Sequence, residues 1–208
     1  MYRYQSYGGQ IKIGGINTSK IELNDLFKAW LAISIAFAIV IGGFSFSIDF
    51  ITVFIIAALT VGLGFIIHEM GHKLVAQRYG CFAEFRAFNQ MLILAVIMSF
   101  FGFVFAAPGA VMISGPVGIR RNGKISMAGP LANLIFALFF LSLLLIPVTG
   151  LLKTLAGYGF LINTWLGLFN MIPFGNFDGK KILRWNKLVY GVMVVVGFTL
   201  MFSQAFIR

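Results

Sequence analysis

Six long stretches without a single charged residue constrain what this chain can fold into. They cover residues 29–48, 50–67, 87–119, 125–152, 154–177 and 188–207. An α-helix needs about 20 apolar residues to cross the hydrocarbon layer of a membrane, and the stretches approach or exceed that length. Hydrophobic residues make up 60% of the chain and charged residues 11%, which excludes an ordinary soluble domain. We therefore expect residues 1–208 to form a single membrane-embedded domain.

The positive charge of the chain indicates how these stretches are arranged. The net charge is +10. Because Lys and Arg collect in the cytoplasmic loops of multi-span proteins, we attribute this charge to topology and expect no nucleic-acid partner. If all six stretches crossed from a cytoplasmic segment at 1–28, the basic clusters at 120–124 and 180–187 would lie outside. If 87–119 instead enters and leaves on the cytoplasmic side, only Lys153 and Arg208 lie outside, so the charge pattern favours five spans over six.

The predicted fold is an all-α polytopic membrane protein with about five to six transmembrane helices. A membrane-associated re-entrant or β-hairpin segment is expected over 80–127, where Gly102 and Pro108 are among the helix breakers. The sequence leaves open whether this segment forms strands or a helical hairpin. Irregular backbone at membrane depth must be shielded by protein or line a water-filled cavity, so a cavity is implied. Ser19 and Glu22 have the spacing of a capping box, which predicts a helix that runs on into the first span.

The only two histidines of the chain lie four residues apart, at His68 and His72, with Glu69 directly after the first. On a helix, positions four apart share one face, so both imidazoles can bind one metal ion. A carboxylate beside the first ligand can accept a proton from water at that metal. This HExxH pattern predicts a catalytic zinc site with Glu69 as the base, because ionisable groups in membrane helices are costly and usually functional.

A third ligand has to be a carboxylate or Cys81, because no third histidine exists. Cys81 is unpaired and is more simply interpreted as a reduced apolar side chain. Asp178 is the remaining acid that the five-span topology places on the same membrane side as His68. The other acids are assigned elsewhere: Asp49 to the outer surface, Glu22 and Asp25 to the start of the first helix, and Glu84 to a surface pair with Arg86.

Two separated motifs resemble those of the site-2 protease family of intramembrane zinc metalloproteases. The first is His68-Glu69-Met70-Gly71-His72, and the second is the NxxPxxxxDG pattern made by Asn170, Pro173, Asp178 and Gly179. Gly129-Pro130-Leu131-Ala132-Asn133 is similar to the small-residue and asparagine motif of the family's middle helix. The resemblance covers a core at about 50–180. Many members carry a PDZ domain in a loop on the far side of the membrane, and here no predicted outside loop has room for one.

The resemblance implies a role for each matching residue. His68, His72 and Asp178 would bind one Zn²⁺, and Glu69 would be the general base and later the proton donor. Asn133 and Asn170 would contact the substrate backbone or the oxyanion. The alternative for both asparagines is a hydrogen bond to a neighbouring helix.

The predicted function is intramembrane endoproteolysis near the cytoplasmic face of a cell membrane, with transmembrane proteins as substrates and the lipid bilayer as surroundings. A membrane-embedded edge strand in 80–127 is expected to pair with the unwound substrate. Three other functions are alternatives: a prenyl-processing protease, a metal transporter and a catalytically silent scaffold. A transporter has no need for Glu69 beside His68, and a scaffold has no need for a complete ligand set. Substrate identity, the trigger of cleavage and the oligomeric state stay open.

Overall fold

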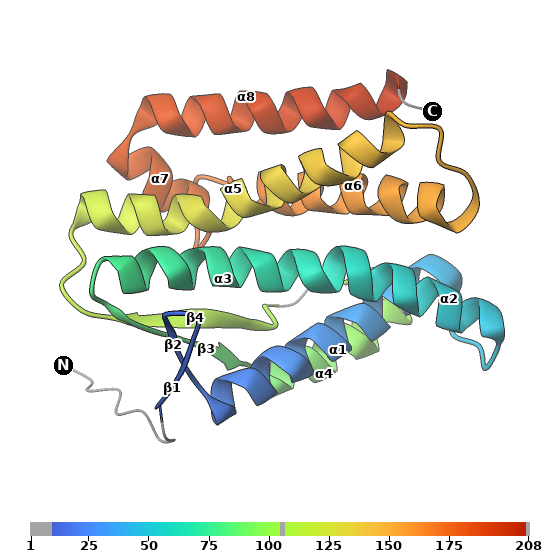
Figure 1. Cartoon of the computed structure of the whole chain (residues 1–208), viewed down its shortest axis with the longest axis horizontal. Helices are drawn as coiled ribbons and strands as arrows, with labels where there is room; N and C mark the ends of the chain where they lie inside the picture. The colour runs from blue at the N-terminus through green and yellow to red at the C-terminus, as the bar shows by residue number, and fades with distance from the viewer. Residues whose placement is uncertain (1–9, 105–106, 207–208) are drawn as a thin grey trace.

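A computed structural model describes residues 10–104 and 107–206 of the chain (Figure 1). The predicted placements of residues 1–9 of the cytoplasmic segment and of Arg208 lie outside the described residues. The helices are α1 (Lys20–Gly42), α2 (Ile48–Ala57), α3 (Leu63–Arg78), α4 (Asn89–Ser99), α5 (Ile119–Leu144), α6 (Gly150–Asn170), α7 (Asp178–Trp185) and α8 (Lys187–Ser203). The strands are β1 (Gln10–Ile13), β2 (Ile16–Ser19), β3 (Phe82–Ala87) and β4 (Gly109–Ser114).

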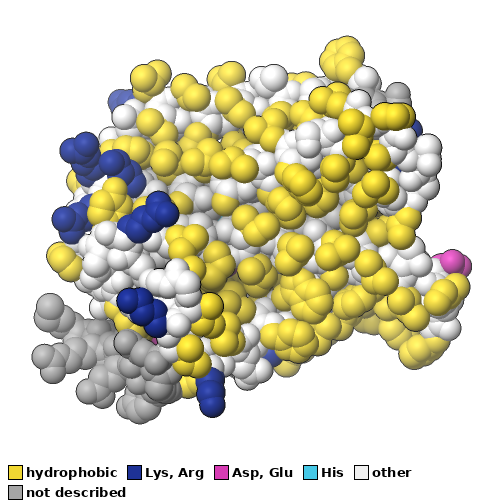
Figure 2. All heavy atoms as spheres, viewed as in Figure 1, with side chains coloured by type: hydrophobic (Ala, Val, Ile, Leu, Met, Phe, Trp, Pro, Cys, Tyr) yellow, Lys and Arg dark blue, Asp and Glu magenta, His cyan; other side chains and the backbone are white. Residues whose placement is uncertain are grey.

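Four helical stretches are long and apolar enough to cross a membrane: Lys20–Gly42, Ile48–Arg78, Ile119–Leu144 and Lys187–Phe206. The helix α6 runs beside α5 over 21 residues but is less apolar, because it carries Lys153 and the buried polar residues Asn163 and Thr164. The predicted five to six spans are therefore found in part, as four apolar stretches and one more polar helix. Hydrophobic side chains cover the length of the molecule, and most of the visible Lys and Arg gather at one end, hereafter the basic end (Figure 2).

The stretch Ile48–Arg78 contains a π-helical turn, Ala58–Gly62, between α2 and α3. Wider hydrogen bonding in a π turn exposes carbonyl groups to other donors. The Ala58 carbonyl accepts from Trp30 Nε1 at 3.1 Å, and the Thr60 carbonyl accepts from Asn163 Nδ2 at 3.4 Å. The turn thus ties the stretch that carries the histidine pair to α1 and α6.

The segment predicted as strands or a helical hairpin contains both. β3 and β4 pair antiparallel with Phe82 opposite Ser114 and Ala87 opposite Gly109, and α4 lies in the connection between them. The chain therefore returns alongside itself, as a re-entrant segment would. The all-α expectation is wrong in detail, because β1 and β2 form a second two-stranded sheet that the sequence analysis did not anticipate.

A buried ion pair joins α1 to the helix that carries the histidines. The Glu22 carboxylate, 0% exposed, accepts hydrogen bonds from Lys73 Nζ, from Thr18 Oγ1 at 2.7 Å and from the Phe85 backbone N–H at 2.9 Å. One carboxylate of α1 thus accepts hydrogen bonds from β2, α3 and β3 and holds these elements together. Removing either charge of a buried ion pair leaves the other charge uncompensated and destabilises the fold.

The predicted capping box is half formed. Ser19 Oγ accepts from the Glu22 backbone N–H at 3.1 Å and begins α1 as predicted, while the Glu22 carboxylate turns to Lys73 instead. The predicted pair of Glu84 with Arg86 is present at 2.7 Å. Its predicted surface location is wrong, because Glu84 is 5% exposed and also accepts from the Ser19 hydroxyl.

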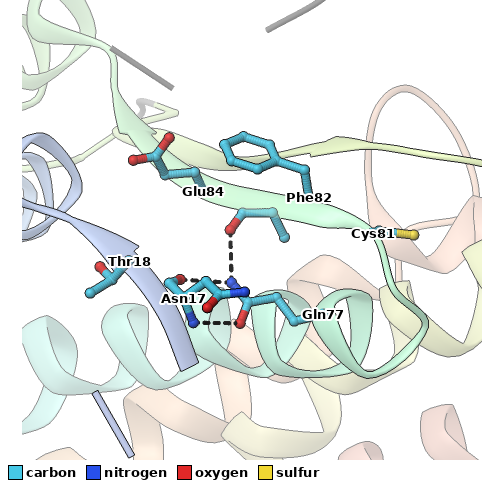
Figure 3. Close-up of a pocket in the computed structure, with 7 residues that line it drawn as sticks. Asn17, Thr18, Gln77, Cys81, Phe82 and Glu84 are labelled. Carbon is cyan, nitrogen blue, oxygen red and sulfur yellow. Dashed lines mark hydrogen bonds between the residues drawn. The ribbon is translucent and has the colours of Figure 1, made fainter. Parts of the chain in front are cut away.

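Gln77 of α3 connects β2 to β3 through its side-chain amide (Figure 3). Its Oε1 accepts from Asn17 N at 3.0 Å, and its Nε2 donates to the carbonyls of Asn17 at 2.7 Å and Ala83 at 3.2 Å. The amide thus satisfies strand backbone groups that no neighbouring strand pairs. The N-terminal hairpin is therefore attached to the end of α3.

We expect Lys73→Met to lower the free energy of unfolding by about 3–5 kcal/mol, because it leaves the Glu22 carboxylate buried without its charged partner. Thermal unfolding in detergent measures this change. Lys28→Met is the matched control: Lys28 pairs with Asp25 at 3.5 Å but is 44% exposed, so its loss should cost less than about 1 kcal/mol. Equal effects of the two variants would contradict a stabilising role for the buried pair.

Candidate metal centre

Three potential ligands meet where α3 faces the start of α7. His72 Nε2 lies 3.0 Å from His68 Nε2 and 3.0 Å from Asp178 Oδ2, and His68 Nε2 lies 3.4 Å from the same oxygen. The three ligand atoms all lie within 4.8 Å of one another, and each residue is less than 10% exposed. Atoms bound about 2.0–2.2 Å from a tetrahedral zinc ion lie roughly 3.3–3.6 Å apart, so the observed separations of 3.0–3.4 Å come within about 0.3 Å of the spacing that such an ion requires.

A chain of side-chain amides fixes the orientation of the His68 ring. Asn133 Nδ2 donates to the Gly64 carbonyl at 3.0 Å and to Asn163 Oδ1 at 3.1 Å. Because a carbonyl can only accept, Asn133 Oδ1 is the atom that faces His68 Nδ1, 2.6 Å away. An amide oxygen needs a donor, so His68 carries its proton on Nδ1 and keeps the Nε2 lone pair for a metal.

The His72 ring is held in the same way by the backbone of α5. Its Nδ1 lies 2.8 Å from the Ile125 carbonyl oxygen, which can only accept. His72 therefore also carries its proton on Nδ1 and presents Nε2 to Asp178. Both rings therefore direct Nε2 toward the cluster, the nitrogen that a metal ion would bind.

Gly129 lets α5 approach the two rings. A Cβ atom at this position would lie 2.4 Å from His72 Nε2 and 2.6 Å from His68 Nε2, which no side chain tolerates. The neighbouring contact is equally close, since a Cβ on Gly71 would lie 2.7 Å from the Ala128 carbonyl oxygen. Glycine at positions 71 and 129 therefore lets α3 and α5 pack closely beside the two imidazole rings.

The turn before α7 places Asp178 opposite the histidines. Gly175 adopts φ +60°, a left-handed conformation that favours glycine, between the end of α6 and Asp178. A Cβ on Gly179 would lie 2.1 Å from the Met171 carbonyl oxygen, so the start of α7 packs directly against the end of α6. Lys181 Nζ lies 3.4 Å from Asp178 Oδ1, the oxygen that does not face the rings.

The general-base candidate Glu69 contacts the β3–β4 sheet. Its Oε2 accepts a hydrogen bond from the Val111 backbone N–H of β4 at 3.0 Å, and the residue is 8% exposed. Glu69 therefore connects the histidine helix to β4.

Comparison with known proteins gives two relatives, both from Methanocaldococcus jannaschii. The first, named "Putative zinc metalloprotease MJ0611", is 42% identical over 187 residues, which cover 88% of this chain and 94% of the relative. The chain belongs to this zinc metalloprotease family. "Zinc metalloprotease MJ0392" is 30% identical over 178 residues, 83% of this chain but 43% of that protein, so this chain spans less than half of its length. No family model and no solved structure matches the chain.

The family implies zinc, and the described residues contain one suitable cluster for it. Two imidazole nitrogens and one carboxylate oxygen are a donor set typical of a catalytic zinc site in a metalloprotease, with a position left over for a reactant. Cys81, the alternative third ligand, is buried near Ala76, Ala83 and Ile125 and takes no part in the cluster. The structure thus brings together the predicted ligands His68, His72 and Asp178.

The two asparagines with predicted substrate contacts differ in position. Asn133 is 0% exposed and bonded to His68, whereas Asn170 Nδ2 donates to the Leu166 carbonyl of its own helix at 2.9 Å. Asn163 was missed by sequence reasoning, although an asparagine in the middle of an apolar helix is a recognisable signal. The contacts from the Ile125 carbonyl and the Val111 N–H were also missed, because backbone groups leave no mark in the sequence.

We expect Asn133→Ala to weaken zinc binding by about 10–100-fold, because the acceptor that fixes the His68 ring is lost. Competition with a zinc-selective chelator measures the affinity. Asn170→Ala removes an amide of the same size that does not contact a ligand, so it should leave zinc affinity unchanged. An unchanged affinity in Asn133→Ala would show that the amide chain does not position the ligand.

Proposed function

We propose that this chain is an intramembrane zinc endopeptidase that cleaves transmembrane segments of other proteins, as in regulated intramembrane proteolysis by site-2 proteases. One observation carries the proposal: His68, Glu69 and His72 lie on Ile48–Arg78, a 31-residue helical stretch long and apolar enough to cross a membrane. A metal site on such a helix acts on bonds that lie at or near membrane depth. The family membership supplies the zinc metalloprotease chemistry.

The proposed topology follows the charge pattern. We place the basic end in the cytoplasm of a multi-pass cell-membrane protein, and we count α6 as a fifth span because it packs along α5. The metal centre belongs to that end, since Asp178 begins α7 and α7 itself carries Lys180, Lys181 and Arg184. Cleavage would then release a cytoplasmic fragment.

The reaction divides between the metal and Glu69. His68, His72 and Asp178 would hold the zinc ion, and the ion would supply a Lewis acid for a peptide carbonyl and for water. Val111 N–H holds Glu69 Oε2 in place, and among the described residues Glu69 Oε1 has no hydrogen-bond partner. Oε1 would therefore be the oxygen that accepts a proton from the attacking water and returns it to the leaving amide nitrogen.

The outer edge of β4 is suited to hold an extended substrate. Phe85 of β3 lies opposite Val111 of β4, and their backbone N–H groups point out of the two opposite edges of the sheet. The Phe85 N–H donates to Glu22 at the β3 edge, and the Val111 N–H donates to Glu69 at the β4 edge. Alternation along a strand then directs the N–H and C=O of Gly109 and Ile113 to the same side as Val111. A peptide paired with this edge would lie beside Glu69. A transmembrane helix must unwind to pair in this way, so helix-breaking residues in the substrate would favour cleavage.

Glu69→Gln is expected to retain zinc and to lower the rate of peptide cleavage by about 10²–10⁴-fold, because the proton acceptor is lost while the ligands stay. Asp178→Ala should lose both zinc and cleavage. Metal content and cleavage of a model transmembrane substrate are measured on the same detergent preparations. Asp49→Asn serves as the control, because Asp49 lies in the first turn of α2, 19 residues before His68 on the same helical stretch.

A wild-type protein that holds zinc but cuts no membrane substrate would contradict the proposal. Zinc flux into liposomes that is unchanged in Glu69→Gln would then favour transport, which does not use the carboxylate as a base.

Ile113→Pro is expected to reduce kcat/KM about tenfold, because proline removes one outward N–H from the β4 edge without removing a bond to β3. Ile113→Ala changes the side chain and keeps the N–H, so it isolates the backbone contribution. Zinc content should be equal in both variants. Equal activity of the proline and alanine variants would show that the substrate does not pair at this edge.

A further inference from the structure

An open groove of about 420 Å³ lies between the end of α3 and the start of α5. Two cationic side chains border it, Arg78 from the last turn of α3 and Lys124 from the first turns of α5. Tyr79 lies beside them, and its ring is covered by the Arg121 guanidinium at 5.6 Å from the ring centre. One side of the groove therefore presents concentrated positive charge.

The rest of the groove is apolar. Val75, Met127 and Leu131 line it along the two helices, toward the middle of the apolar stretches to which they belong. Leu131 is 37% exposed, and Val75 and Met127 are partly exposed. The groove thus has a charged end that could bind a lipid headgroup and an apolar part that could bind an acyl chain.

The protein itself does not neutralise the charged end. The chain has six acidic residues, and the ion pairs of the described residues use Lys28, Lys73, Arg86 and Lys181, together with the histidines at Asp178. Within the part of the chain that the structure describes, Arg78 and Lys124 form no ion pair. Both side chains are therefore available to an external anion.

We infer that this groove binds an anionic phospholipid, with the phosphate between Arg78 and Lys124 and an acyl chain along Val75, Met127 and Leu131. Basic pockets between membrane helices on the cytoplasmic side are typical sites for such headgroups. The inference rests on the membrane placement of the basic end and not on protease activity. Val75 lies one helical turn from His72, so the bound lipid borders the metal centre.

Native mass spectrometry of the detergent-purified full chain, titrated with phosphatidylglycerol, tests the inference. We expect wild type to retain one phosphatidylglycerol and the double variant Arg78→Gln/Lys124→Gln to bind it at least about tenfold more weakly. The matched control, Lys180→Gln/Arg184→Gln, removes two charges from the same end outside the groove and should change the affinity by less than about twofold. Thermal unfolding confirms that the variants fold alike.

Three results would overturn the inference. Equal loss of lipid in both double variants would indicate diffuse attraction to the basic end. Equal binding of phosphatidylcholine by wild type would show that the charge is not recognised. Displacement of the lipid by inorganic phosphate at millimolar concentration would show that the apolar part of the groove contributes nothing.

Discussion

The metal centre depends on the amide chain that runs from α6 through α5 to α3. The side-chain amide nitrogen of Asn163 donates to the carbonyls of Thr60 and, at 2.9 Å, Gly159. Its amide oxygen therefore faces Asn133 and accepts from Asn133 Nδ2. The amide oxygen of Asn133 is then the atom that faces His68. Each step leaves a single choice of donor and acceptor, so the backbone carbonyls at the start of the chain determine that His68 Nδ1 is a donor to Asn133. Among apolar helices such a chain has no water to replace it, and three helices must therefore pack together before the site exists.

A second constraint is the backbone of the returning segment. One edge of the β3–β4 sheet is occupied by α1, where Glu22 and Asp25 accept from Phe85 and Ala87. The opposite edge carries Val111, whose N–H is bound by Glu69. The acids of α1 thus close the edge that faces away from the metal, and the open edge is left beside the base. The strand β4 therefore both positions the proposed base Glu69 and supplies the edge proposed to bind the substrate.

The grouping of His68, His72 and Asp178 could be predicted from the sequence more fully than the fold around these residues. His68, Glu69 and His72 follow from spacing, and Asp178 follows from charge topology together with the second motif, because both signals lie in side chains. The N-terminal hairpin and the burial of Glu84 were missed, since a short polar strand and a charged pair look the same in sequence whether buried or exposed. The π turn at Ala58–Gly62 also leaves no sequence pattern, because it is stabilised by Trp30 and Asn163 from other helices.

The most direct test of intramembrane proteolysis is the position of the cut. Purified protein is reconstituted in liposomes with a transmembrane substrate, and the products are sequenced by mass spectrometry. The account predicts that the wild-type protein cuts within the apolar segment, toward its cytoplasmic end. Cleavage confined to the soluble flanks of the substrate, with the apolar segment intact, would contradict it.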